Sequence, residues 1–254
     1  PATGAVITIL TGGGIAVASD GTIYIGEYYT QQGEGRIRRI APDGIISTYA
    51  GGNDIGGPMG DGGPAIQASL ISIRGLAVGA DGALYISDYG HASVRKVDTT
   101  GMISTLVGAV GPIDIDVARD GSVYFSDLLA PRNTPRIWRV SPSGLMTKVA
   151  AADCAPEEAD CFHFDNHEAA YGLTVAPDRS IYFASTGASA YSNFIYRLNN
   201  KVLTKIAGSD LVNNPVVEGL AGQVAIAPQA LTFSPDGNLY FANSSISLQK
   251  ITSA

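Results

Sequence analysis

Residues 75–108 read GLAVGADGALYISDYGHASVRKVDTTGMISTLVG, and this stretch decides the fold. This stretch contains four short segments in which β-branched or aromatic residues recur at every second position. The segments lie at 76–78, 84–87, 94–97 and 103–107. Asp-Gly or Thr-Gly dipeptides separate most of these segments, and such dipeptides favour tight reversals of the chain. The pattern therefore predicts four strands in one sheet, which is one blade of a β-propeller.

The same pattern occurs five times along the chain. The second strands show it most clearly, in the sequences TIYIGEY, ALYISDY, SVYFSDL, SIYFAST and NLYFANS. One turn aspartate marks each copy, at Asp20, Asp81, Asp120, Asp178 and Asp236. A period of about 40 residues with four strands is typical of propellers, and the longer intervals contain insertions.

The repeats predict one domain with blades at 14–51, 75–108, 114–150, 172–208 and 230–254. The last copy ends after its third strand, and the strand that it lacks is found at 4–12. We therefore predict an all-β, five-bladed propeller of four-stranded antiparallel blades, in which the N-terminal strand completes the C-terminal blade. Six blades are the alternative, if an insertion forms strands of its own.

Composition narrows the range of functions. The net charge of −7 argues against nucleic-acid binding, because phosphate contacts need clustered lysines and arginines and the 16 present are dispersed. No apolar run approaches the length of about 20 residues that spans a bilayer. The chain does not begin with methionine, and we interpret it as a mature or excised domain that is monomeric in isolation.

The two cysteines, Cys154 and Cys161, lie in one acidic insertion, AADCAPEEADCFHF. Their spacing suits a disulfide that closes a small loop. A disulfide implies an oxidising compartment, which predicts a secreted, periplasmic or cell-surface location. Two unrelated free thiols are the alternative, and the spacing is poor for structural zinc.

Two stretches carry a family resemblance. ALYISDYGHASVRKV (83–97) resembles the NHL repeat, and GDGGPAIQASLISIRGLAV (60–78) is similar to the segment between blades of bacterial NHL proteins. The chain departs from that pattern where His91, Ala92 and Ser93 replace an Asn-His-Arg triplet, and in having five blades where six are commoner. The resemblance implies a propeller, in a family whose members bind proteins, RNA or ligands and are occasionally lyases.

The lengths of the connections distinguish the two ends of the blades. Turns between the first and second strands, and between the third and fourth, are minimal, and we expect that end to be featureless. The extra length lies at the other end, in 52–72, 151–170, 209–228, 28–35, 128–135 and 186–193. Long loops on a rigid scaffold are where binding and catalysis concentrate, so we expect function there.

At that end, the starts of the first strands and the ends of the second strands should surround the mouth of the central channel. The predicted ligand-binding residues are Asp114, Arg74, Tyr171, Gln229 and His91. Asp114 is the strongest candidate, because the other four repeats have glycine or alanine at its position. A carboxylate there costs desolvation unless another group pairs with it.

Four further mouth residues permit two interpretations: Glu27, Asp88, Asp127 and Asn243. Acids at the end of a strand can cap loop amides, which is a structural role. The same oxygens could instead bind Ca²⁺, and propeller lactonases similar to gluconolactonase hold a metal at this place with acidic and asparagine residues. Arg74 could also neutralise Asp114 or Asp127 and leave no metal site.

The segment CFHFDNHE offers a second candidate metal site. His163 and His167 are four residues apart, so on a helix they would share a face and could bind Zn²⁺. The alternative is a solvated polar loop packed by Phe162 and Phe164.

The sequence therefore predicts an extracytoplasmic recognition module that presents its long loops to a protein, glycan or small ligand. The alternative function is that of a metal-dependent, lactonase-like hydrolase or lyase, with Asp114, Asp127 and Asn243 around the cation.

Overall fold

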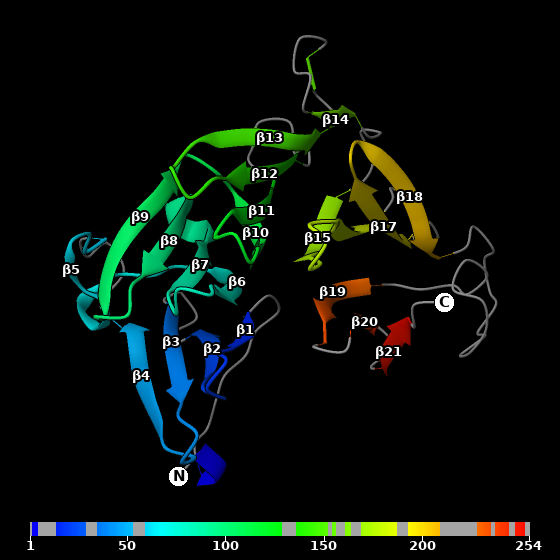
Figure 1. The fold of residues 1–254 in the computed structure, drawn as a ribbon. Helices are drawn as coiled ribbons and strands as arrows, with labels where there is room; N and C mark the ends of the chain where they lie inside the picture. The colour runs from blue at the N-terminus through cyan, green and yellow to red at the C-terminus, as the bar shows by residue number, and fades with distance from the viewer. Residues whose placement is uncertain are drawn as a thin grey trace. The chain divides into compact units, whose positions relative to one another are not determined.

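A computed structural model describes residues 2–4, 14–28, 35–52, 59–128, 136–151, 154–155, 161–163, 169–186, 193–208, 228–234, 237–243 and 247–251. Its regular structure is built from β-strands, with short 3-10 turns at η1 (Ala2–Gly4), η2 (Ala65–Gln67) and η3 (Tyr89–His91). Figure 1 shows these strands grouped into successive small sheets. The chain forms two compact units, Pro1–Gly121 and Ser122–Ala254, which are described in turn.

The first unit contains two complete blades and the first strand of a third. Blade 1 is an antiparallel sheet of β1 (Ile15–Val17), β2 (Ile23–Tyr28), β3 (Gly35–Ile40) and β4 (Ile46–Gly51). Blade 2 consists of β6 (Ile73–Val78), β7 (Leu84–Asp88), β8 (Ser93–Val97) and β9 (Met102–Gly108), with the short β5 (Gly63–Pro64) added beside β9. The first strand of blade 3 is β10 (Pro112–Val117).

The second unit contains the other strands of blade 3 and the last two blades. Blade 3 continues with β11 (Val123–Asp127), β12 (Arg136–Val140) and β13 (Met146–Ala151), and β14 (Phe162–His163) pairs parallel to β13. Blade 4 consists of β15 (Ala169–Val175), β16 (Ile181–Thr186), β17 (Asn193–Asn199) and β18 (Val202–Ala207). Blade 5 contains β19 (Pro228–Phe233), β20 (Leu239–Asn243) and β21 (Ser247–Ile251).

The prediction of an all-β propeller with five antiparallel blades is confirmed, and the described residues supply four or more strands to blades 1 to 4 and three strands to blade 5. The short strands from insertions, β5 and β14, attach to existing blades and do not build a sixth. Apart from Gly4, the N-terminal segment predicted to complete blade 5 lies outside the described residues.

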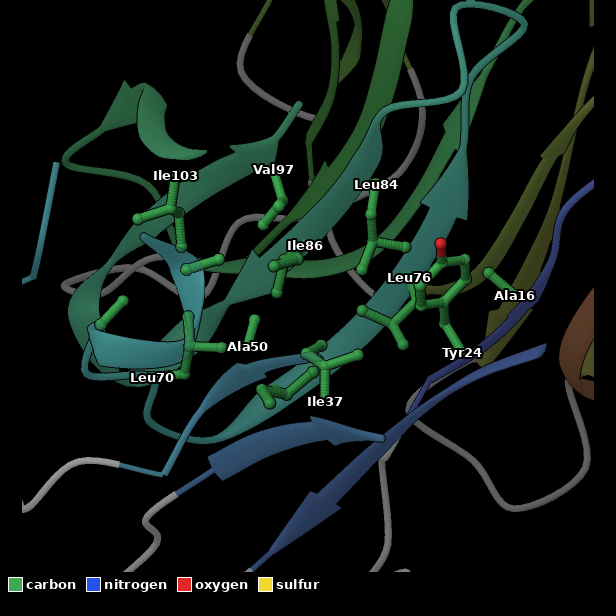
Figure 2. Packing of buried hydrophobic residues seen from close by; sticks show 13 residues of the cluster. Ala16, Tyr24, Ile37, Ala50, Leu70, Leu76, Leu84, Ile86, Val97 and Ile103 are labelled. Carbon is green, nitrogen blue, oxygen red and sulfur yellow. The ribbon is translucent and has the colours of Figure 1, made fainter. Parts of the chain in front are cut away.

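Apolar side chains of blades 1 and 2 pack into one core cluster (Figure 2). Ile37 of β3 and Ile86 of β7 are fully buried in it. Leu70, from the connection between η2 and β6, is also fully buried, so this connection is part of the core. Burial of each such side chain contributes about 1.5–3 kcal/mol of hydrophobic stabilisation.

The marker aspartates hold the short turns between the first and second strands. The carboxylates of Asp20, Asp81 and Asp178 accept hydrogen bonds from the backbone N–H two residues ahead. In Asp20 the bond from Thr22 is the main cause of a lowered pKa. Burial opposes the shift in Asp178, but bonds from Ser180 and Arg197 lower its pKa overall.

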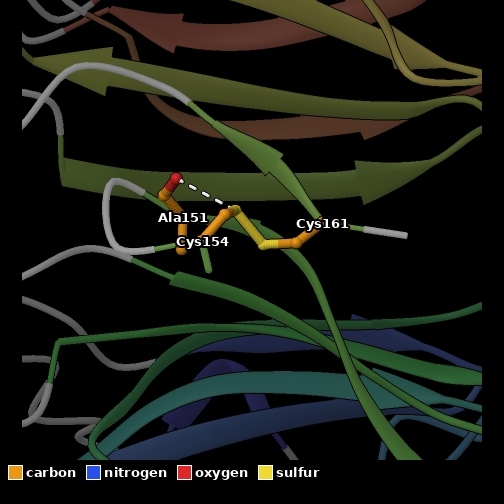
Figure 3. The surroundings of a disulfide bond; sticks show 3 residues. All are labelled: Ala151, Cys154 and Cys161. Atoms are coloured by element: carbon orange, nitrogen blue, oxygen red, sulfur yellow. Dashed lines mark hydrogen bonds between the residues drawn. A yellow bond between two sulfur atoms is a disulfide. The ribbon is translucent and has the colours of Figure 1, made fainter. Parts of the chain in front are cut away.

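The predicted disulfide between Cys154 and Cys161 is present (Figure 3). The Sγ atom of Cys154 lies 3.3 Å from the carbonyl oxygen of Ala151, the last residue of β13. Cys161 immediately precedes β14, whose Phe162 and His163 pair with the end of β13. The disulfide therefore links the segment that follows β13 to the residue that precedes β14, at the edge where these two strands pair.

We expect the double variant C154S/C161S to be about 2 kcal/mol less stable to unfolding than the parent, because the crosslink restricts the unfolded chain. Urea denaturation of both proteins measures the difference, and dithiothreitol should lower the parent to the level of the variant. The reductant should leave the variant itself unchanged. Equal stability of oxidised parent and variant would contradict the expectation.

Candidate functional site

Three acidic side chains are buried at the ends of second strands. Glu27 is the residue before the last of β2, and Asp88 and Asp127 are the last residues of β7 and β11. The exposed fractions of Glu27, Asp88 and Asp127 are 2%, 0% and 3%. Burial of a carboxylate is unfavourable unless cations or hydrogen-bond donors compensate it. The neighbouring third strand supplies these partners in each blade.

A β-bulge at one repeated position directs those partners. The pairing of the third strand with the fourth shifts register between Ile37 and Arg38 in blade 1, and at the matching place in the next three blades. In blades 1 to 3 the residue after the shift is Arg38, Arg95 or Trp138. Bulges commonly re-aim a side chain, and here each of these residues turns toward the acid of its own blade.

Blades 1 and 3 pair their acids in a similar way. The Nε atom of Arg36 donates to Oε2 of Glu27 at 2.8 Å, and a guanidinium nitrogen of Arg38 lies 3.9 Å from the same oxygen. The indole N–H of Trp138 donates to Oδ2 of Asp127 at 3.0 Å. A guanidinium nitrogen of Arg136 lies 3.9 Å from that oxygen.

Blade 2 has a larger network around Asp88 and Arg95, both fully buried. One guanidinium nitrogen of Arg95 lies 3.4 Å from Oδ2 of Asp88. The other donates at 2.7 Å both to the carbonyl oxygen of Met59 and to Oδ1 of Asp61. The network therefore ties the segment that precedes β5 to the body of the blade.

Two further contacts complete the environment of Asp88. Its Oδ1 accepts a hydrogen bond from the backbone N–H of Ile71 at 2.9 Å. Its Oδ2 lies 2.9 Å from Nδ1 of His91, which belongs to η3. Asp88 thus caps a loop amide, the contact that its structural interpretation requires, and His91 acts as its partner.

Asp114, in β10, fits its position because blade 2 has a glycine beside it. A Cβ atom on Gly75 would lie 2.9 Å from Oδ1 and 3.0 Å from Cα of Asp114. The same Oδ1 accepts a hydrogen bond from the backbone N–H of Ile115 at 2.9 Å. The absence of a side chain at residue 75 therefore makes room for the carboxylate.

Arg74, in β6, lies against an aromatic ring. Its guanidinium carbon is 4.5 Å from the centre of the Tyr89 ring, a cation–π contact. Within the described part of the chain, its Nε atom is buried without a hydrogen-bond partner. Arg74 and Tyr89 therefore form a second feature at this end of blade 2.

For the remaining predicted site residues, the structure gives the strand at most and not the position of the side chain. Tyr171, Gln229, Asn243 and His163 lie in β15, β19, β20 and β14, and their side chains are outside the described part. His167 lies outside the described residues altogether. Among the residues that are described, no group of three or more His, Cys, Asp or Glu is placed to hold a metal ion.

Sequence reasoning missed the donors that pair with the acids. Arg95 and Trp138 occupy the third position of SVRKV and RIWRV, and Arg38 the third position of RIRRI. That position always holds a large residue, and this regularity was the available signal.

The described residues also contain no helix that is long and apolar enough to cross a membrane.

Comparison with known proteins places the repeats in context. Residues 56–114 match the family described as the Teneurin NHL domain. A gluconolactonase of Zymomonas mobilis is 24% identical over 223 residues, which cover 80% of this chain and 57% of that protein. Teneurin-1 of Gallus gallus is 25% identical over 221 residues, which cover 72% of this chain and 8% of that protein.

Among solved structures, a gluconolactonase from Xanthomonas campestris has a similar fold, with a TM-score of 0.59 and 18% identity. The match covers 96% of this chain and 76% of that one. The chain spans less than two thirds of the length of the curated relatives above. These findings bear out the resemblance seen in the sequence.

Proposed function

We propose, from the premise that this chain is an NHL-repeat β-propeller, that it is an extracytoplasmic recognition module. Its ligand would be a protein, a glycan or a small molecule held by the long loops. The observation that carries the proposal is the internal pairing of the buried acids, because these are the groups that a metal-dependent enzyme would need.

The contacts of those acids leave them poorly suited to a cation. Calcium binds six to eight oxygens, several of them from carboxylates. Glu27 already accepts a hydrogen bond from Arg36 at 2.8 Å, and Asp127 accepts one from the Trp138 indole at 3.0 Å. A metal ion would have to displace these donors and would meet the positive charge of the arginines.

Other features favour a rigid recognition surface. Arg95 fixes the segment around Met59 to blade 2, so part of a long connection is held in one conformation. A preorganised loop loses less entropy on binding than a mobile one. The disulfide supports an oxidising compartment, and Arg74 over Tyr89 is a pair of the kind enriched in binding surfaces.

A lactonase-like hydrolase is the second candidate, and the Zymomonas mobilis gluconolactonase favours it because the similarity covers most of this chain. Under this alternative, Asp114, Asp127 and Asn243 would hold a divalent cation. The cation would polarise the lactone carbonyl when bound, and the protein would supply carboxylate and amide oxygens to hold it.

One experiment separates the two functions. The purified protein is dialysed against CaCl₂ or ZnCl₂, and its metal content, melting temperature with and without chelator, and hydrolysis of glucono-δ-lactone are measured. We expect less than one retained equivalent, no change of melting temperature on chelation, and no hydrolysis above the buffer rate. One equivalent lost together with thermal stability, with hydrolysis abolished by D127N, would establish the second function instead.

The recognition function has its own positive test. The protein is applied to arrays of immobilised glycans and of extracytoplasmic protein domains, beside the variants R74A and K250A. We expect saturable binding to at least one ligand, weakened by R74A and unchanged by K250A, since Lys250 is an exposed residue of β21. No binding on either array would count against the proposal.

A further inference from the structure

A cavity of about 530 Å³ lies in the second unit, where blades 3 and 4 meet at the end with the short turns. Tyr124, Ile181 and Leu198 contribute apolar surface, and all three are largely buried. Four cations line the same cavity, namely Arg139, Lys148, Arg179 and Lys201. Among the described residues that line the cavity none is acidic, although the chain as a whole has a net charge of −7.

Arg179 occupies a position that is glycine in the other blades. Its backbone N–H donates to the carbonyl oxygen of Ala176 at 2.8 Å. The matching bond in the other four turns is made by Gly21, Gly82, Gly121 and Gly237, which have φ between 75° and 85°. Arg179 has a φ of 69°, a left-handed conformation that is unfavourable for a residue with a Cβ atom.

Lys201 is the second such exception. Asn199 pairs with Val202, so Asn200 and Lys201 form a two-residue hairpin turn, with φ of 47° and 63°. Both values are those of a type I′ turn, in which glycine is preferred at the second position. The corresponding turns of blades 1 to 3 carry Gly44, Gly101 and Gly144, each with positive φ.

Blade 4 therefore carries cations at two positions where glycine would be easier to accommodate, and both cations line one cavity. Strained backbone of this kind often accompanies a functional site. Arg139 and Lys148 contribute from β12 and β13 on the other side, and Ser122 holds Arg139 through two hydrogen bonds of 3.2 and 2.8 Å. Positive charge is thus gathered around apolar walls.

We propose that this cavity binds a small organic anion, a phosphate or sulfate ester carried on an apolar body. Guanidinium groups match the geometry of these oxyanions, and several cations around a partly enclosed site attract a multiply charged ligand. The volume lies within the range of about 300–1,000 Å³ typical of small-molecule sites. The site is at the end of the blades opposite the long loops and is independent of the proposed recognition function.

Isothermal titration with 1-naphthyl phosphate tests the proposal, with neutral 1-naphthol and inorganic phosphate titrated in parallel. We expect one site for the ester, and weaker binding or none for the other two compounds. The variant R179G/K201G should bind at least about tenfold more weakly, since it loses two charged contacts. Its melting temperature should equal or exceed that of the parent, because glycine suits both turns.

The variant R119Q/K250Q removes the same number of charges from exposed residues outside the cavity lining and should bind like the parent. Equal affinity of R179G/K201G and parent would overturn the proposal, as would the absence of binding by the ester. An equal loss in R119Q/K250Q would show only a long-range effect of net charge. Equal binding of 1-naphthol would show an apolar pocket without anion recognition.

Discussion

Replacing Arg95 with methionine is expected to lower the free energy of unfolding by about 3–5 kcal/mol, because Asp88 would remain buried without its cation. Arg95 also donates to Met59 and Asp61, so the segment around residue 59 should detach from blade 2. Urea denaturation measures the loss of stability. Limited proteolysis should show new cleavage in this segment under conditions where the parent is resistant.

Lys96 provides the matched control for Arg95. It is adjacent in β8, but its 2.9 Å ion pair with Asp81 is partly exposed, so K96M should cost at most about 1 kcal/mol. The double variant R95M/D88L should recover part of the loss, since it removes the unpaired charge as well. A loss of stability in R95M no larger than that in K96M would contradict the role assigned to the network.

Replacing Gly14 with alanine is the second change expected to have a large effect, a loss of about 2–3 kcal/mol. A Cβ atom at residue 14 would lie 2.6 Å from the backbone nitrogen of Leu76 and 2.8 Å from the backbone carbon of Gly75. Backbone atoms of a neighbouring blade cannot move aside as a flexible side chain can. Blades 1 and 2 would have to separate where their first strands approach.

The melting temperature and urea midpoint of G14A should be compared with those of G108A. A Cβ atom at Gly108 would meet no atom of the described residues within 4 Å, and the φ of Gly108 lies outside the left-handed region. G108A should therefore be as stable as the parent or slightly more stable. If G14A were equally harmless, the close approach of the two blades would not constrain residue 14.

The blades themselves could be predicted because their signals are local. Alternation in LYISD and the turn around Asp81 and Gly82 specify a strand and a reversal within a few residues of sequence. The β-bulges could not be predicted in this way, because a shift of register is a property of two paired strands. From the sequence alone, which does not reveal the bulge, Arg95 is indistinguishable from the solvent-exposed cations of the third strands.

Only part of the candidate site could be predicted from the sequence, because most of its contacts join segments that are distant along the chain. The sequence located Asp88 and Asp127 at strand ends, which follows from period and turn position. It did not identify Ile71 or Trp138 as their partners, because those contacts depend on how distant segments fold back. Asp114 stands out in the sequence because the other repeats have glycine or alanine at its position, but the room that Gly75 provides for it required three-dimensional information.

The short strands β5 and β14 have a consequence for the behaviour of the protein at high concentration. The last strand of a blade presents backbone N–H and C=O groups that a strand from another molecule can bind, which is a route to aggregation. In blade 2, β5 pairs with Met102 and Ile103 of this edge, and in blade 3, β14 pairs with Ala150 and Ala151, next to the disulfide. Each of the two insertions therefore covers one end of an outer strand and shortens the stretch that a strand from another molecule could pair with.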